Sequence, residues 1–239
     1  IVWPETSVPE LLEWAQPKLD QMSEAAEGVP LIAGVQRQSK DRIYHNSFFV
    51  LGRGGLLEGL YDKKHLVPFG EYIPGGELLG NLGLPGAASS QGYGFTPGTL
   101  SDTIEVEGIG AIRPLICYEG IFAEEVTPDV RPRLMVLITN DAWFGKAAGP
   151  AQHLAQARLR AIEQGLPMVR AANTGISAMI DAKGRVTASM PLDTEGYLDV
   201  ALPGAGVETL YIRYGDWPVL AVLALMLATL LGRSTGKTD

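Results

Sequence analysis

Short apolar segments that recur along most of the chain are the feature that most limits its fold. "LIAGV" (31–35) and "LMVLIT" (134–139) are rich in aliphatic residues and lack the alternation of apolar and polar positions that marks a half-exposed strand. Strands of this kind occur in sheets that are covered on both faces. The segments interpreted as strands are 1–3, 31–35, 46–51, 103–107, 111–117, 134–139, 167–173 and 177–181.

Two segments between these strands are typical of helices. Residues 8–26 carry leucines and a methionine at roughly helical spacing, with Pro17 expected to kink the helix. Residues 151–165 place small apolar side chains on one face and end at Gly165, a suitable residue for the end of a helix. The alternation of strands and helices predicts an α/β domain with layered sheets.

Charge and metal-ligand content exclude some classes of function. The net charge of −8 argues against a nucleic-acid partner, because a phosphate backbone requires a basic face. One cysteine and three scattered histidines (His45, His65 and His153) cannot form a zinc site of the usual spacing. We therefore expect neither a metal nor another cofactor.

The two ends of the chain differ. "IVWPETSVPE" has no initiating Met, basic region or signal-peptide core, and is interpreted as the start of a piece of a longer chain. Residues 217–232 carry no charge and would span about 24 Å as a helix, slightly less than a bilayer core. A buried core helix is one interpretation; the absence of a polar face favours a transmembrane helix.

The flanks of this run suggest an orientation in a membrane. Tyr211, Tyr214 and Trp217 resemble an interfacial aromatic belt, and Arg233 and Lys237 favour a cytoplasmic C-terminus. Arg213 on the opposite flank weakens that assignment. With this orientation the bulk of the chain lies on the outer face of the membrane.

Residues 70–98 form a long segment rich in glycine and proline that also carries leucines, among them Leu78 and Leu79. Long loops in compact domains are usually functional or disordered. The segment is interpreted either as an irregular loop packed on the core or as an apolar lid that faces lipid.

Cys117, in "LICYEG", is the only cysteine, so its thiol is either an inert core group or a nucleophile. Its place at the end of an apolar strand favours the second possibility. No local Cys–His signature accompanies His65 or His153, and the sequence around Ser177 lacks the second glycine of a nucleophile elbow.

Charged turns follow other strand-like segments. Glu5 lies in "WPETSVP", Lys63, Lys64 and Glu71 lie in "YDKKHLVPFGEY", and "TNDAWFG" follows residues 134–139. Each turn alone is typical of a solvated loop. Together with "ICYEG" and "ARLRAIEQGLPMVRAANTGISAMID", they resemble the nitrilase superfamily, and more narrowly its membrane branch, the apolipoprotein N-acyltransferases.

The resemblance covers residues 1 to about 181 and implies a nitrilase-like αββα sandwich over 1–210. A C-terminal transmembrane helix and short tail would follow over 211–239. The family carries several membrane helices ahead of this domain, and none is present in these 239 residues.

The resemblance also implies roles for individual residues. Glu5 would be the general base, Lys63 (rather than Lys64) would stabilise the oxyanion, and Cys117 would be the nucleophile that carries an acyl group as a thioester. Glu71 would orient Lys63 and Glu5. Tyr118 and Glu119 would support the nucleophile, with the Tyr118 N–H as a second oxyanion donor. The lipid-binding residues would be Trp143, Phe144, Leu78 and Leu79.

The implied reaction moves an acyl chain from a membrane phospholipid to Cys117, and from there to the N-terminal amine of a diacylglyceryl-cysteine on an apolipoprotein. It implies an enzyme of the bacterial inner membrane with its catalytic domain on the periplasmic face. Two alternatives stay open from the residues. One is a soluble nitrilase-type amidase that hydrolyses a small carbon–nitrogen substrate, and the other is a membrane-anchored binding module with an inert Cys117.

Overall fold

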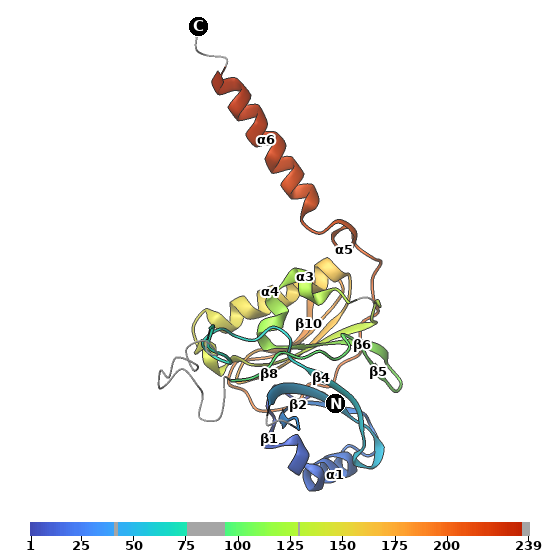
Figure 1. Ribbon diagram of the computed structural model, residues 1–239. Helices are drawn as coiled ribbons and strands as arrows, with labels where there is room; N and C mark the ends of the chain where they lie inside the picture. The colour runs from blue at the N-terminus through green and yellow to red at the C-terminus, as the bar shows by residue number, and fades with distance from the viewer. Residues whose placement is uncertain (41–42, 76–93, 129, 236–239) are drawn as a thin grey trace.

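Two stacked β-sheets with helices on both outer faces form the body of the molecule in a computed structural model (Figure 1). The structure describes residues 1–40, 43–75, 94–128 and 130–235. The four-stranded sheet has the order β1 (Val8–Leu11), β2 (Leu31–Gln38), β3 (Tyr44–Leu51) and β4 (Leu57–Asp62). The second sheet has the order β10-β9-β8-β7-β6-β5, with bounds β5 (Ile104–Val106), β6 (Gly110–Ile116), β7 (Leu134–Asn140), β8 (Met168–Asn173), β9 (Ser177–Ile180) and β10 (Val186–Met190).

The three central strands of the larger sheet, β6, β7 and β8, run parallel. Their carboxyl ends therefore meet at one edge, where the short 3-10 helices η3 (Cys117–Ile121) and η4 (Asp141–Phe144) follow β6 and β7 directly. In open α/β sheets this edge is where binding and catalytic side chains collect.

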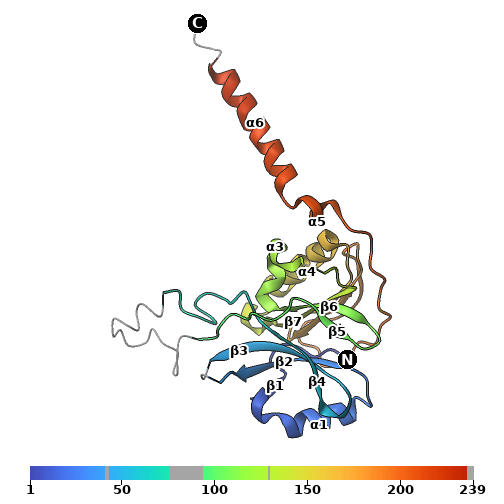
Figure 2. The ribbon, with the colours of Figure 1, turned by 45° about the vertical axis from the view of Figure 1, so that its right-hand side comes forward.

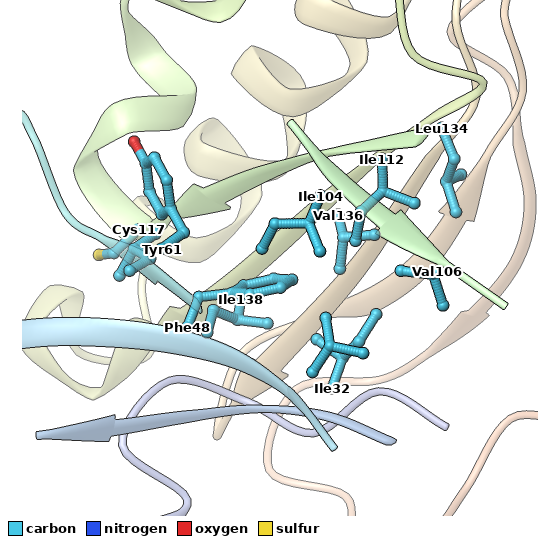
Figure 3. Close-up of a cluster of buried hydrophobic side chains, with 12 residues drawn as sticks. Ile32, Phe48, Tyr61, Ile104, Val106, Ile112, Cys117, Leu134, Val136 and Ile138 are labelled. Carbon is cyan, nitrogen blue, oxygen red and sulfur yellow. The ribbon is translucent and has the colours of Figure 1, made fainter. Parts of the chain in front are cut away.

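Three apolar clusters hold the layers together. The central cluster lies between the two sheets and joins Phe48 and Val50 of β3 to Val136 and Ile138 of β7. Figure 3 shows this cluster, with Cys117 at one end and its sulfur turned away from the branched side chains. Helices cover the outer faces of the same strands, so both faces are buried, which explains why these strands read as continuous apolar runs.

The outer clusters place one helix layer on each sheet. Leu19 and Met22 of α1 (Gln16–Ala25) pack with buried residues of β2 and β3. Ala157 and Ala161 of α4 (Gly149–Gln164) pack on the larger sheet, together with a residue of α3 (Ala123–Val126). The order helix, sheet, sheet, helix confirms the expected αββα sandwich (Figure 2).

The structure corrects several expectations for individual elements. The helix predicted over 8–26 is instead β1, the 3-10 helix η1 (Leu12–Trp14) and α1. Pro17 lies in the first turn of α1 and causes no kink, because the N–H that proline lacks has no partner there. The strand expected at 1–3 is a single bridge between Val2 and Ile32, while β4 and β10 were missed. The helix predicted over 151–165 is confirmed as α4, and Gly165 ends it in the left-handed conformation.

Beyond β10 the chain follows an irregular path along the body before it reaches α5 (Leu210–Tyr214) and α6 (Trp217–Thr235). The Gly206 N–H donates to the Gly165 carbonyl at 2.9 Å, which ties this segment to the end of α4. The helix α6 projects away from the sandwich, and its side chains from 217 to 232 are exposed.

Within the described residues, no helix combines the length and the apolar character needed to cross a membrane. The structure thus shows a helix where the sequence predicted one, but it does not show the expected transmembrane span over 217–232. The core of the expected lid, residues 76–93 with Leu78 and Leu79, lies outside the described residues.

Candidate active site

Cys117 occupies a strained turn at the carboxyl end of β6. It is the first residue of η3 and has φ of +49°, a left-handed conformation that non-glycine residues rarely adopt. Such strain persists only where the surroundings enforce it, and it is concentrated at functional sites. The thiol is largely buried, and the Thr139 side chain and the Asn140 N–H are its hydrogen-bond partners.

Glu5 reaches the same place from the N-terminal end of the chain. Its Oε2 accepts a hydrogen bond from the Asn140 N–H at 2.8 Å, and its Oε1 accepts one from Asn46 Nδ2 at 2.7 Å. The backbone at Glu5 lies directly against Gly34 of β2, where a Cβ atom would come within 2.7 Å of the Glu5 Cα. Only glycine at that position permits Glu5 to approach the sheet so closely.

Lys63 follows β4 and is 1% exposed. Its Nζ contacts both carboxylate oxygens of Glu71, at 2.9 Å and 2.8 Å. Glu71 is held in turn by the Val67 N–H, which donates to Oε2 at 2.8 Å. Lys64, in contrast, pairs with Asp102 at a partly exposed position. The role of Lys63 rather than Lys64 as the oxyanion donor stays a prediction.

The three expected catalytic groups are close enough for their charges to act on one another. Burial lowers the pKa of Lys63, but Glu5, the Cys117 sulfur and Glu71 outweigh this effect and hold that pKa above its ordinary value. Lys63 is therefore a permanent ammonium. The Asn140 N–H donates to Glu5 Oε2 and also contacts the Cys117 sulfur, so the carboxylate and the thiol share one hydrogen-bond donor.

The thiol itself is neutral at physiological pH. Burial raises the pKa of Cys117 to about 12, the negative charge of Glu5 adds to the rise, and Lys63 opposes it. A preformed thiolate–ammonium pair is therefore disfavoured. The arrangement suits a thiol that gives up its proton to Glu5 during attack.

Glu119 connects the segment that contains Lys63 and Lys64 to the turn that contains Cys117. The Oε1 atom accepts hydrogen bonds from the Tyr61 hydroxyl and the Lys64 N–H, both at 2.7 Å, and from the His65 N–H at 3.3 Å. The Oε2 atom accepts one from the Ile116 N–H at 2.8 Å. Burial raises the pKa of Glu119, and these donors only partly offset it. Its side chain does not reach the thiol through any of these contacts; it fixes two backbone segments.

Tyr118 lies next to the nucleophile, but its ring turns to an aromatic cluster. It contacts His65 and Phe122 edge-on, with ring centroids 5.4 Å and 4.9 Å apart. His65 stacks on Phe122 and pairs with Glu125, so it does not serve as a base for Cys117. The role of the Tyr118 N–H as an oxyanion donor stays a prediction.

The expected rim residues Trp143 and Phe144 lie on η4. Trp143 is 84% exposed, and Phe144 is 43% exposed and packs edge-on against His153. Phe69, at the tip of the turn between Lys63 and Glu71, is a further exposed aromatic residue with a left-handed backbone. The structure thus leaves large apolar side chains exposed on two loops that lead to the site.

Two groups of polar residues were missed in the sequence. Asn46 of β3 bridges the two carboxylates, because its Nδ2 also donates to Glu71 Oε1 at 2.9 Å. Behind η4, Asp141 is buried between His153 and Arg170, with Oδ1 to Nδ1 at 3.0 Å and Oδ2 to NH2 at 2.8 Å. Asn46 lies in an ordinary apolar strand segment, so only the fold brings it to the site.

A cavity of about 750 Å³ lies beside this group rather than on it. Its walls include Tyr61, Lys64, Glu119 and Arg113, and neither Lys63 nor Cys117 is among its lining residues. The expected catalytic residues Glu5, Lys63 and Cys117 are all buried. No group of three or more His, Cys, Asp or Glu side chains within the described residues is arranged to hold a metal ion.

Comparison with known proteins identifies relatives of this chain. The chain is 42% identical to an apolipoprotein N-acyltransferase from Rhodopseudomonas palustris, over 99% of this chain and 46% of that protein. It is 45% identical to one from Bradyrhizobium diazoefficiens, over 95% of this chain and 44% of the relative. The chain therefore spans less than half the length of these relatives.

A solved carbon–nitrogen hydrolase from Helicobacter pylori G27 has the same fold, with a TM-score of 0.57 and 21% identity. The match covers 78% of this chain and 66% of that one. The family model for carbon–nitrogen hydrolases matches residues 1–211, which is most of the 239 residues. On this evidence the chain belongs to the carbon–nitrogen hydrolase family.

Proposed function

We propose that this chain is the catalytic part of an apolipoprotein N-acyltransferase. It would transfer an acyl chain from a membrane phospholipid, through a thioester on Cys117, to the N-terminal amine of a diacylglyceryl-cysteine. The observation that carries the proposal is the convergence of Glu5 and Lys63 on a single buried thiol in a strained turn. The names of relatives that are more than 40% identical support the choice of reaction.

In the first half-reaction, the sulfur attacks the ester carbonyl of the phospholipid while Glu5 takes the thiol proton. The raised pKa of Cys117 supports a concerted loss of this proton. Lys63, kept cationic and oriented by Glu71, stabilises the oxyanion. Loss of one such donor costs about 10²–10³ in rate in other enzymes. Glu5 then returns the proton to the departing lysophospholipid oxygen.

In the second half-reaction, the amine attacks the thioester and Glu5 takes its proton. A closed site favours this outcome, because a thioester reacts with amines and is lost to hydrolysis when water has access. The low exposure of Lys63 and Cys117 is consistent with such exclusion of water.

Location in the bacterial inner membrane, with the catalytic domain on the periplasmic face, is part of the same proposal. The exposed apolar surface of α6 supports insertion of this helix into lipid, and Trp143 and Phe69 are suited to contact the acyl chains of substrates. The division into a catalytic domain over 1–210 and an anchor over 211–239 stays a proposal, as does the lid over 70–98.

The test uses the protein in phospholipid vesicles that carry a labelled acyl chain. Without an amine acceptor, lysophospholipid release should stop after about one equivalent per enzyme, since the acyl group stays on Cys117. Addition of a diacylated lipopeptide should restart release and give a triacylated product, and a Cys117→Ala variant should do neither.

Continuous release of free fatty acid without the lipopeptide would overturn the proposal in favour of a hydrolase. Turnover of small amides by the same protein would support the amidase alternative. Absence of any release, together with an inert thiol, would instead favour the binding module.

A further inference from the structure

Asn46 holds a fixed orientation between the two carboxylates of the site. It is buried on β3, and its Nδ2 donates to Glu5 Oε1 at 2.7 Å and to Glu71 Oε1 at 2.9 Å. A carboxamide nitrogen carries two hydrogens, so both are used. Because ionised carboxylates only accept hydrogen bonds, the NH₂ group must face them and the carbonyl oxygen must face away.

That carbonyl oxygen has no donor. Among the described residues, Asn46 Oδ1 is a buried side-chain atom without a hydrogen-bond partner. The backbone carbonyl of the same residue is already used, because it accepts from the Lys63 N–H at 2.8 Å. Buried acceptors are nearly always satisfied, so this oxygen is suited to a donor from outside the protein.

The incoming amine brings such a donor. A primary amine that attacks the thioester has two N–H bonds, of which one is given up to the base and the other is kept in the product amide. Oδ1 belongs to the same planar group as the Nδ2 that contacts Glu5. The open acceptor therefore lies within one amide group of the base, and the two hydrogens of one attacking nitrogen call for a base and an acceptor in the same place.

We propose that Asn46 Oδ1 accepts a hydrogen bond from the N–H that the amine nucleophile retains, and so directs the acyl-enzyme towards primary amines. The inference rests on the proposed function. It deepens that function by naming the group that selects the acceptor, a role that the Glu5–Lys63–Cys117 set leaves unassigned.

The step balances as follows. The amine nitrogen forms a bond to the thioester carbonyl carbon, and one of its protons moves to Glu5. The carbon–sulfur bond then breaks, the Glu5 proton passes to the sulfur, and Cys117 is regenerated as a thiol. The product is an amide, whose remaining N–H is the hydrogen held by Asn46.

The two half-reactions depend on Asn46 in different ways. The phospholipid ester brings no N–H to its reacting carbonyl, so acylation of Cys117 uses Asn46 only through its hold on Glu5 and Glu71. Aminolysis depends on the same two contacts and also on the Asn46 Oδ1 acceptor. Removal of the amide should therefore slow aminolysis more than acylation.

The experiment measures the two rates separately on the protein in phospholipid vesicles. Acylation is followed as the mass gain on Cys117, and the isolated acyl-enzyme is then mixed with a diacylated lipopeptide or with buffer. We expect Asn46→Ala to slow both steps, with aminolysis slowed at least about tenfold more than acylation, the effect of one lost hydrogen bond to the amine. Asn46→Ser provides the same comparison if the alanine variant does not fold. Gln38→Ala, an amide deletion on the neighbouring strand β2, is the control and should leave both rates unchanged.

Equal losses in the two steps would overturn the inference and leave Asn46 only a positioning residue for Glu5. Failure of the wild type to acquire an acyl group would instead count against the proposed function itself, so the two failures are distinguishable.

Discussion

Gly34 controls the position of Glu5, the proposed general base, although it has no side chain of its own. In a Gly34→Ala variant, the new Cβ would lie 2.4 Å from the Thr6 backbone nitrogen and 2.7 Å from the Glu5 Cα, both backbone atoms that cannot rotate away. Ordinary contact begins at 3.4 Å, so the backbone of Glu5 and Thr6 must retreat by about 1.0 Å. Displacements near 1 Å cost about 10²-fold in rate, and we expect a loss of that order in acylation of Cys117.

The assay combines the acylation rate with thermal unfolding, because overpacking also costs about 1–3 kcal/mol of stability. Gly59→Ala is a matched control, since its Cβ would meet the Ile104 side chain rather than the Glu5 backbone. That variant should lose stability but keep most of its acylation rate. A Gly34→Ala protein that acylates within threefold of the wild-type rate would refute the claim that Gly34 sets the position of Glu5.

Further variants test the roles of individual groups. Lys63→Ala should lower the rate of Cys117 acylation about 10²–10³-fold, whereas Lys64→Ala should largely preserve that rate. Glu5→Gln should have opposite effects on two reactions: acylation slows because the base is lost, while alkylation of Cys117 by iodoacetamide at pH 8 becomes faster, because removal of the negative charge lowers the pKa of the thiol. In wild type, alkylation should continue to rise above pH 9 without a plateau, since the pKa of Cys117 is about 12. Glu119→Gln should cost about 2 kcal/mol and lower Tm by about 4–8 °C, because an amide cannot accept hydrogen bonds on both sides.

A specific result would contradict each of these predictions. A greater loss of acylation in Lys64→Ala than in Lys63→Ala would mean that Lys63 is not the oxyanion donor. Slower alkylation of the Glu5→Gln variant would contradict the electrostatic account of the thiol. An unchanged Tm for Glu119→Gln, equal to that of the exposed control Glu195→Gln, would remove the structural role of Glu119.

The layered fold could be predicted from the sequence because fully covered strands leave a strong apolar signal. Residues 134–139, for example, correspond closely to β7. The weaker elements carried no such signal. β4 contains Gly59 and charged residues, and β10 is an edge strand with a partly exposed face. The segment that forms β1 was assigned to a helix, because Leu11 and Leu12 fall at roughly helical spacing from Leu19 and Met22.

The catalytic set was found through the order of its motifs, whereas its geometry follows from the tertiary fold. Glu5 precedes β1, Lys63 follows β4 and Cys117 follows β6 of the other sheet, and the resemblance to a family identified them. Asn46 carries no comparable signal, because an asparagine in an apolar strand has the same appearance whether it faces solvent or two carboxylates. Glu119 also required the structure, since its partners at Tyr61 and Lys64 are far away in the sequence.

Intact-mass spectrometry after incubation with phospholipid vesicles tests the central claim most directly. The account predicts that the wild-type protein gains the mass of one acyl chain, that peptide mapping places it on Cys117, and that hydroxylamine removes it as expected for a thioester. A Cys117→Ser variant should gain no thioester-linked chain. An unmodified wild-type protein, or an acyl chain at any other residue, would contradict the assignment of Cys117 as the nucleophile.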